Sequence, residues 1–170
     1  LVHGAMSCNK QFDMKWICGI PATLYGPNYH TDNRQSHFIH DLVKKILRAK
    51  ILNEEVILWG DGNQRREIIH VNDFSKLLID INEKFENEIV NAGALSDYSI
   101  REFAEKICEI VDYDANIIKY DKTKYVGVFK KKLNISKIKK KIQNYDEKLT
   151  NIDDGLKQVV EWYKLTKAYK

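Results

Sequence analysis

Two arginines follow a tight glycine turn in the stretch WGDGNQRREIIHVND, which covers residues 59–73. An apolar, β-prone run comes directly after them, so Arg65 and Arg66 stand at the start of a strand. Successive side chains of a strand point to opposite faces, and the two guanidinium groups therefore meet different surroundings. Guanidinium matches phosphate oxygens with two parallel hydrogen bonds. The pair is either a solvated strand edge or includes a ligand for an anion.

Histidines gather within residues 30–40. Histidine has a pKa near working pH and can give or take a proton, which suits acid–base chemistry beside a ketone. Taken alone, His37 is an ordinary histidine before an amphipathic helix. His30, Asp32, His37 and His40 could also supply metal ligands. Because His37 and His40 are three residues apart and no glutamate base accompanies them, no metal site is expected.

The elements that must position these residues alternate between strands and helices, which predicts an α/β fold. Residues 24–28 are expected to form a turn, Asn72 or Asp73 to cap a helix, and Ser99 with Glu102 to form a capping box. Strands are expected over residues 16–22, 56–60, 66–71, 88–93 and 116–121, and helices over 1–13, 38–50, 74–81, 99–111 and 153–169, with a lysine-rich helix within 130–143.

Composition favours an ordinary globular domain: 44% of the 170 residues are apolar. No apolar run approaches the roughly 20 residues of a membrane span, and no secretory signal is visible. Cys8, Cys18 and Cys108 are odd in number and widely spaced, which favours packing roles in a reducing, cytoplasmic protein. The chain does not begin with Met and is expected to start within a longer protein.

Much of the net charge of +4 comes from residues 130–143. The lysines there alternate with Leu133, Ile135, Ile138 and Ile142, which predicts the solvated face of a helix. A basic run can also bind nucleic acid, but arginines and stacking aromatic residues are scarce here.

Four motifs come in a fixed order: PATLYGP (21–27), SHFI (36–39), WGDGNQRREIIHVND (59–73) and NAG-x₅-SI-x-E (91–102). In this order and spacing the chain resembles the nucleotide-sugar epimerases, dehydratases and reductases of the extended short-chain dehydrogenase family. The Ser-His pair at residues 36–37 points to the GDP-L-fucose synthase branch, whose members epimerise and reduce GDP-4-keto-6-deoxymannose.

The resemblance implies the C-terminal part of such an enzyme. Residues 1–24 would be the tail of the Rossmann-type domain, and 25–170 mainly the substrate-binding domain, with strand 88–93 returning to the Rossmann sheet. No Gly-x-Gly-x-x-Gly occurs in the chain. The family's glycine-rich loop and Tyr-x-x-x-Lys would lie upstream of Leu1.

The resemblance also implies roles for individual residues. Arg66 matches the family's phosphate-binding arginine, and His37 matches its general acid, whose partner cysteine would lie upstream. Lys45 falls where the family has a basic residue near the nucleotide phosphates, although a plain surface lysine is the alternative. Trp59 is expected to contact substrate.

Further expected contacts come from two other motifs. Pro21 and Leu24, with His37, would adjoin the nicotinamide, and Thr23 would contact the sugar or diphosphate where close relatives have Asn. Lys131 would contact substrate from a segment that departs from the family, because its usual proline position is occupied by Tyr125.

These residues imply an NADP-dependent enzyme acting on a GDP-linked keto sugar, homodimeric when complete, with no nucleic-acid or membrane partner. Residues 27–36 have the composition of a lid. One alternative is a nucleotide-sugar 4-epimerase or dehydratase with tightly bound NAD. The other is a non-catalytic module that binds nucleic acid or an acidic partner through residues 130–143.

Overall fold

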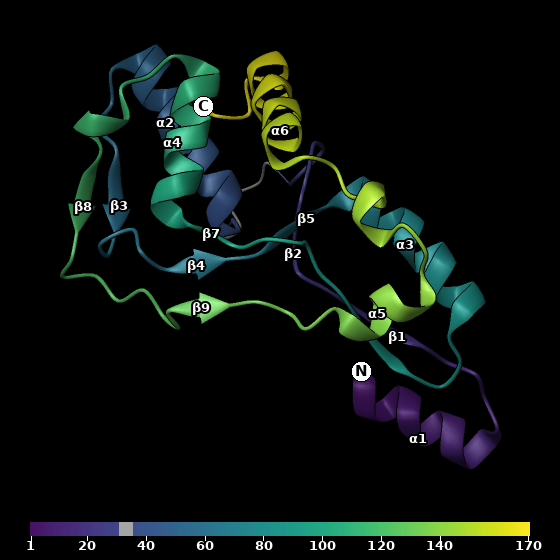
Figure 1. The fold of residues 1–170 in the computed structure, drawn as a ribbon. Helices are drawn as coiled ribbons and strands as arrows, with labels where there is room; N and C mark the ends of the chain where they lie inside the picture. Colours follow the sequence, from purple (N-terminus) through teal and green to yellow (C-terminus); the bar gives the residue numbers. More distant parts are fainter. Residues whose placement is uncertain (31–35) are drawn as a thin grey trace. The chain divides into compact units, whose positions relative to one another are not determined.

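The computed structural model of the protein describes residues 1–30 and 36–170 (Figure 1). Strands and helices alternate along the chain, and at least three strand pairs among the described residues run parallel. The expected α/β class is therefore confirmed. The chain forms two compact units, each built from separate segments: unit 1 from Leu1–Leu24, Glu67–Ser96 and Lys132–Thr150, and unit 2 from Tyr25–Arg66, Asp97–Lys131 and Asn151–Lys170.

Unit 1 contains parallel strands β1 (Cys18–Pro21) and β6 (Ile89–Ala92). A second pair joins β5 (Ile68–His70) to β2 (Thr23–Tyr25). The turn expected over residues 24–28 is therefore wrong at its start, since Leu24 and Tyr25 end β2. The partner strand lies more than 40 residues away along the chain, and local turn propensity carries no information about it.

Helix α3 (Val71–Lys84) packs against β1 and β6, and the short α5 (Ser136–Lys141) also packs against β6. Helix α1 (Val2–Phe12) contributes no fully buried residue. After η2 (Tyr145–Lys148), a 3₁₀ turn, the unit ends. Its core consists of buried side chains from all three segments: Ala22, Ile69, Leu77, Ile81, Phe85, Val90, Ala92, Ile138, Ile142 and Tyr145.

The single strand expected over residues 66–71 is wrong in one respect: it is divided at Glu67 into β4 (Arg65–Arg66) and β5. Glu67 is buried, and its Oε2 accepts the backbone N–H of Leu133 at 2.7 Å. A buried carboxylate needs such a donor, so the side chain turns inward here and the strand is interrupted.

The expected cap of α3 also requires correction. The N-cap residue is His70, whose Nδ1 accepts the backbone N–H of Asn72 at 3.4 Å. Asp73 is buried within the first turn, and its two carboxylate oxygens accept hydrogen bonds from the backbone N–H and the hydroxyl of Thr150 at 2.7 and 2.9 Å. The Asp73 carboxylate therefore binds Thr150, far away in the chain, and does not cap α3.

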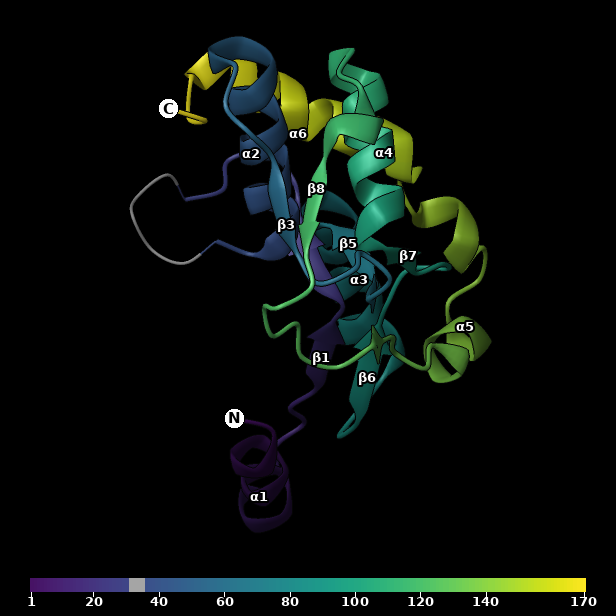
Figure 2. The same cartoon turned by 90° about the vertical axis from the view of Figure 1, so that its left-hand side faces the viewer.

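Unit 2 packs helix α4 (Ile100–Val111) against both α2 (Phe38–Leu52) and α6 (Ile152–Thr166). Parallel strands β3 (Ile57–Trp59) and β8 (Lys119–Asp121) run beside one another, as Figure 2 shows. The strand expected over residues 116–121 is shorter than predicted, because its first part forms η1 (Ala115–Ile117).

The third sheet of unit 2 places β4 between two short strands. β7 (Tyr98–Ser99) runs antiparallel to β4, and β9 (Lys130–Lys131) runs parallel to it. The predicted capping box of α4 is confirmed: Ser99 Oγ accepts the N–H of Glu102 at 3.1 Å, and the Glu102 carboxylate accepts the N–H of Ser99 at 2.6 Å. This cap fixes where β7 ends and α4 begins.

The helix expected within the lysine-rich segment covers only α5, so that Leu133 and Ile135 precede it and Lys130 and Lys131 belong to β9. Ile138 and Ile142 are buried, and Leu133 and Ile135 pack partly buried against the core of unit 1. Of the cysteines, Cys108 is buried while Cys8 and Cys18 are partly buried. None of the helices in the described part of the chain is long and apolar enough to span a bilayer. The assignment of residues 1–24 and 25–170 to separate domains stays a prediction.

Candidate functional site

The turn that leads into β4 requires glycine at two positions. Gly60 and Gly62 both have φ of +81°, a left-handed backbone that favours glycine. A Cβ at Gly62 would lie 2.6 Å from Cε1 of Tyr120, and a Cβ at Gly60 would overlap the Gln64 side chain. This compact turn brings Trp59 and Arg66 onto the same side of unit 2, where both line one cavity.

Arg65 points away from that cavity and is held by acidic partners. Its guanidinium forms ion pairs with Asp97 at 2.7 Å and Glu102 at 3.0 Å. The capping hydrogen bond from the Ser99 backbone and the charge of Arg65 keep the pKa of Glu102 below its usual value. Arg65 therefore ties β4 to the start of α4, a structural role.

Arg66 faces the cavity and has a different set of partners. Its Nη1 donates to the carbonyl oxygens of Val128 at 2.9 Å and Arg65 at 2.8 Å, and its Nη2 donates to Val126 at 3.3 Å. Within residues 1–30 and 36–170 no carboxylate forms an ion pair with it. In that part of the chain its positive charge meets carbonyl dipoles instead, which leaves it suited to an anionic ligand.

The cavity beside Arg66 has a volume of about 770 Å³, within the range typical of small-molecule sites. One face of α2 forms a wall of it, since Phe38, Asp41, Leu42 and Lys45 follow helical spacing. The complete lining combines cations, aromatic rings and polar groups: Ser36, Phe38, Asp41, Leu42, Lys44, Lys45, Leu58, Trp59, Gln64, Arg66, Ile100, Tyr125, Val126 and Gly127.

Two lysines of α2 add positive charge to this wall. Lys45 pairs with Asp41 at 2.9 Å and remains partly exposed. Lys44, which sequence reasoning missed, lies with its Nζ 5.8 Å from the centre of the Tyr163 ring. Its position next to Lys45 was the available signal, but two neighbouring helical residues are about 100° apart and only the tertiary structure shows that both line the cavity.

Two exposed aromatic residues border the same cavity. Trp59 is 60% exposed and Tyr125 is 87% exposed, although both are large rings. Trp59 was expected to contact substrate, whereas Tyr125 was noted only as a departure from the family pattern. An exposed ring at a cavity mouth provides a flat apolar surface for a ligand.

His37 is the N-cap residue of α2, and its side chain makes no capping hydrogen bond. It is exposed, and its neighbours Ser36 and Phe38 line the cavity although His37 itself does not. Arg66, Lys45 and Trp59 are thus brought together in one cavity, with His37 at the adjoining helix start. The catalytic and binding roles of these residues stay predictions.

The remaining expected residues lie elsewhere. Lys131 is exposed on β9, paired in register with Arg66 but absent from the cavity lining. Pro21, Thr23 and Leu24 belong to unit 1, where Pro21 ends β1 and the other two form β2. The cavity of unit 2 is therefore built without them.

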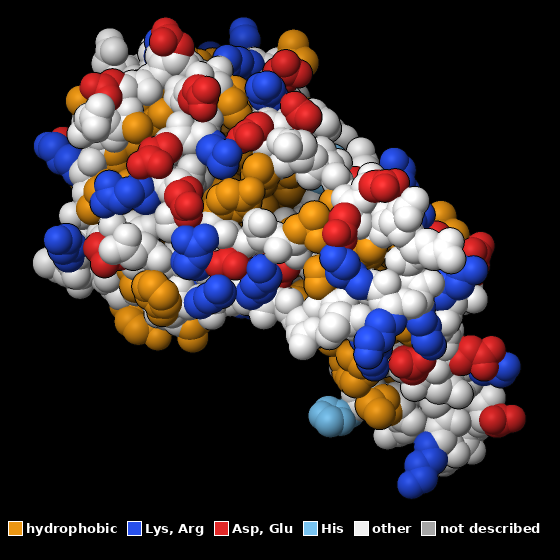
Figure 3. Space-filling view, in the orientation of Figure 1, with side chains coloured by type: hydrophobic (Ala, Val, Ile, Leu, Met, Phe, Trp, Pro, Cys, Tyr) orange, Lys and Arg blue, Asp and Glu red, His pale blue; other side chains and the backbone are white. Residues whose placement is uncertain are grey.

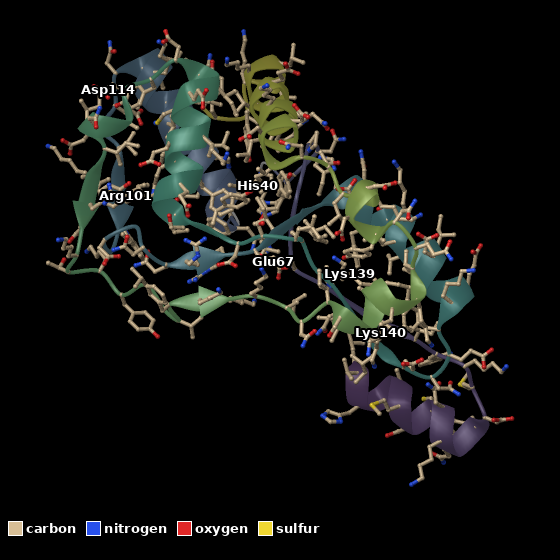
Figure 4. All side chains as sticks on the ribbon, viewed as in Figure 1. His40, Glu67, Arg101, Asp114, Lys139 and Lys140 are labelled. Atoms are coloured by element: carbon tan, nitrogen blue, oxygen red, sulfur yellow. The ribbon has the colours of Figure 1, made fainter. Side chains whose placement is uncertain are left out.

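The histidine-rich segment contains one deeply buried member. His40 is fully buried on α2 (Figure 4), and burial lowers its pKa to about 3, with smaller contributions from His37, Lys44 and His30. Asp32 and the central part of the expected lid lie outside the described residues. No cluster of potential metal ligands occurs among the residues that the structure describes.

Lysines of the basic segment are largely paired on the surface. Lys137 and Lys141 pair with Glu88 at 3.4 and 2.9 Å, and Lys139 pairs with Asp146 at 2.8 Å. Figure 3 shows acidic side chains interspersed with the basic ones on this face, and Figure 4 labels Lys139 on α5. This mixture leaves little unneutralised charge for a polyanion.

The sequence lacks the motif that binds the pyrophosphate of a dinucleotide cofactor. That group needs a glycine-rich turn at a helix N-terminus, and no such turn occurs in the 170 residues. The residues present therefore do not fit a complete dinucleotide site.

Comparison with known proteins identifies the chain's relatives. The model of the NAD dependent epimerase/dehydratase family matches residues 2–93. GDP-L-fucose synthase 1 of Arabidopsis thaliana is 33% identical over 149 residues, which are 86% of this chain and 45% of the relative. GDP-L-colitose synthase of Yersinia pseudotuberculosis is 32% identical over 125 residues, 72% of this chain and 40% of the relative.

Solved structures agree on the fold. A GDP-6-OMe-4-keto-L-xylo-heptose reductase from C. jejuni has a TM-score of 0.86 at 22% identity, covering 97% of this chain and 58% of that one. UDP-glucose 4-epimerase from Thermotoga maritima has a TM-score of 0.82 at 22% identity, covering 98% and 51%. At these identities the likeness establishes the fold alone.

The chain spans about half the length of the curated relatives that it matches. The family match covers more than half of this chain, and the relatives share the α/β fold of extended short-chain dehydrogenases. The chain belongs to the NAD dependent epimerase/dehydratase family.

Proposed function

We propose that this chain is the substrate-binding portion of an NADP-dependent enzyme that epimerises and reduces a GDP-linked 4-keto-6-deoxy sugar. The observation that carries the proposal is the cavity of unit 2, in which Arg66, Lys45 and Trp59 meet. The relatives named GDP-L-fucose synthase and GDP-L-colitose synthase support the substrate class.

Arg66 and Lys45 provide the charge that a diphosphate requires. The planar donors of Arg66 are engaged by carbonyl oxygens, which a phosphate oxygen can replace as a stronger acceptor. Lys45 is paired with Asp41 on the cavity wall, and Lys44 on the same wall is the third cation of the cavity lining. Together they offset the charge of a nucleoside diphosphate sugar.

The aromatic rings of Trp59 and Tyr125 supply the apolar part of the site. Both border the cavity beside these cations, and both are exposed to incoming ligand. A nucleotide presents a flat base next to its charged diphosphate, and this cavity offers both kinds of surface.

His37 would act as proton donor in the epimerisation. Its imidazole is exposed at the start of α2, next to two residues that line the cavity. A proton removed from one face of a carbon beside the ketone must be replaced from the opposite face, and a histidine can deliver it near neutral pH.

Calorimetric titration of this chain with GDP, UDP and dTDP tests the binding role. GDP is expected to bind, and Arg66→Ala to weaken its Kd by about 10- to 100-fold, the range for lost charged hydrogen bonds. Arg66→Lys should recover part of the affinity. Arg48→Ala, which removes a guanidinium that pairs with Glu54 outside the cavity, is the matched control. Unchanged binding by Arg66→Ala would contradict the role.

Turnover of the complete enzyme distinguishes the acid role from the 4-epimerase or dehydratase alternative. His37→Asn is expected to abolish most epimerisation while GDP binding is retained. If this variant turns over GDP-sugar at the parent rate, the alternative gains and the role of His37 is wrong.

A further inference from the structure

Tyr29 forms a contact with the backbone of His37 that no sequence motif indicates. Its hydroxyl accepts the backbone N–H of His37 at 3.0 Å. The Tyr29 ring also stacks on the ring of His40, with centroids 3.8 Å apart and planes inclined by only 8°. One residue therefore touches both the start of α2 and a side chain one turn into it.

The His40 ring, on which Tyr29 stacks, is held in place by its surroundings. His40 is fully buried, and its Nδ1 lies 3.2 Å from the hydroxyl of Tyr163 on α6, which is also fully buried. The low pKa of His40, about 3, keeps its imidazole neutral near pH 7. A neutral buried ring carries no charge that must be solvated, so it can serve as a fixed base for the stack.

The backbone on both sides of the His37 Cα is constrained. Its carbonyl accepts the first helical N–H groups, from His40 at 3.0 Å and Asp41 at 3.1 Å. Its own N–H is taken by Tyr29. With both flanking peptide groups bonded, the direction of the Cα–Cβ bond is set, and only the side-chain torsions of His37 remain to be chosen.

We propose that Tyr29, seated on His40 and Tyr163, is a positioning residue that orients His37 for proton transfer. This inference rests on the proposed function of His37. Proton donors work only when aimed within hydrogen-bond reach of the reacting carbon, and orientation errors of about 1 Å can cost on the order of 100-fold in rate. By holding the backbone N–H of His37, the Tyr29 hydroxyl fixes the backbone position from which the imidazole side chain extends.

Tyr29→Phe is the sharpest variant because it removes the hydroxyl and keeps the ring that stacks on His40. Tyr113→Phe is the matched control, since it removes a hydroxyl beyond the end of α4. In nuclear magnetic resonance spectra of the 170-residue chain, Tyr29→Phe should shift the His37 amide proton upfield and speed its exchange about tenfold, the factor expected for one lost hydrogen bond. The His40 ring signals should stay in place, which shows that the stack survives.

Kinetics of the complete enzyme provide the functional readout. Tyr29→Phe is expected to lower kcat for epimerisation about tenfold at unchanged KM for GDP-sugar. Because a loss of folded enzyme would also lower the apparent kcat, circular dichroism of the variant must show the parent's folded fraction. Tyr29→Leu, which also loses the stack, should lower kcat further.

The outcomes separate this inference from the proposed function. An unchanged His37 amide signal in Tyr29→Phe overturns the positioning role, and so does an unchanged kcat when His37→Asn is impaired. If His37→Asn itself retains full turnover, the proposed acid role fails instead, while the amide signal still reports whether Tyr29 holds the backbone.

Discussion

At the scale of single residues, the two arginines of the opening motif have different surroundings. Arg65 ends in a carboxylate pair with Asp97 and Glu102, and Arg66 ends among carbonyl oxygens at a cavity. The alternation of side chains along β4 accounts for this division. The structure thereby pairs Arg65 with two carboxylates and leaves Arg66 facing the cavity.

Substitution of each arginine by alanine should separate these roles. Arg65→Ala is expected to lower the urea midpoint of unfolding, because it leaves the buried Asp97 without its closest cation, while GDP affinity falls only modestly. Arg66→Ala should weaken GDP binding strongly and change the urea midpoint only slightly. Circular dichroism and calorimetry measure the two effects, with Lys164→Ala as the control for stability. Equal midpoints for Arg65→Ala and Lys164→Ala would refute the assignment.

A pair of glycines tests the turn before β4. Both Gly62 and Gly127 have positive φ, but only Gly62 has a neighbour, Tyr120, where a Cβ would stand. Gly127→Ala should cost about 1 kcal/mol of unfolding free energy from backbone strain alone. Gly62→Ala should cost about 1–3 kcal/mol more, because the crowded ring must move. Thermal unfolding that gives equal losses would count against the crowding.

At the scale of elements, α2 joins the cavity wall to the core of unit 2. Phe38, Asp41 and Lys45 lie on its cavity face, whereas His40 lies buried and contacts Tyr163 of α6. The helix and its apolar stripe were predictable from spacing, and Ile39, Leu42, Val43, Ile46 and Leu47 are indeed buried. The burial of His40 was not predictable from spacing, because a polar residue in this position of the helix can equally lie at the edge of the apolar stripe.

The buried His40 predicts a pH dependence of stability. Its folded pKa of about 3 lies below the ordinary 6.5, so as pH falls the unfolded chain takes up the proton first. Stability should therefore fall as pH drops from 6.5 toward 3, by up to about 1.4 kcal/mol per pH unit for one proton.

Removal of the imidazole provides the check. His40→Gln removes this proton uptake. As pH falls from about 6.5 to about 5, the stability of the variant relative to the parent should therefore rise by about 1.5 kcal/mol. Urea unfolding at several pH values measures it. Other titrating groups, including His70, contribute to both proteins and cancel in the difference. Parallel curves for the two proteins would show that His40 does not titrate as inferred.

At the scale of the whole molecule, the chain has the fold that members of the NAD dependent epimerase/dehydratase family share. Helix α1 has no fully buried residue, and Met6 and Phe12 on it are exposed. We expect this surface to pair with a second copy in the complete protein, as the resemblance implied.

Light scattering of the complete protein tests that expectation. Met6→Lys combined with Phe12→Lys places two charges on the exposed surface of α1 and should convert a dimer to a monomer, halving the measured mass. The matched control, Lys10→Ala, should leave the mass unchanged. A parent protein that is already monomeric at all concentrations would exclude the dimer.

The amino-acid sequence by itself determined the local features of this protein. Helical spacing predicted α2, α4 and α6, and Ser99 with Glu102 predicted the capping box, because these signals depend on residues only three or four positions apart. The ordered motifs also indicated the family that the comparisons confirm.

Only the tertiary structure decided which of these residues meet. The break at Glu67, the capping of α3 by His70 and the pairing of β4 with β7 and β9 depend on partners far away in the chain. The same holds for the hydrogen bond between Tyr29 and the start of α2, and for the position of Lys44 in the cavity wall. Local periodicity carries no information about such partners, because they are selected by packing and by the need to satisfy buried polar groups.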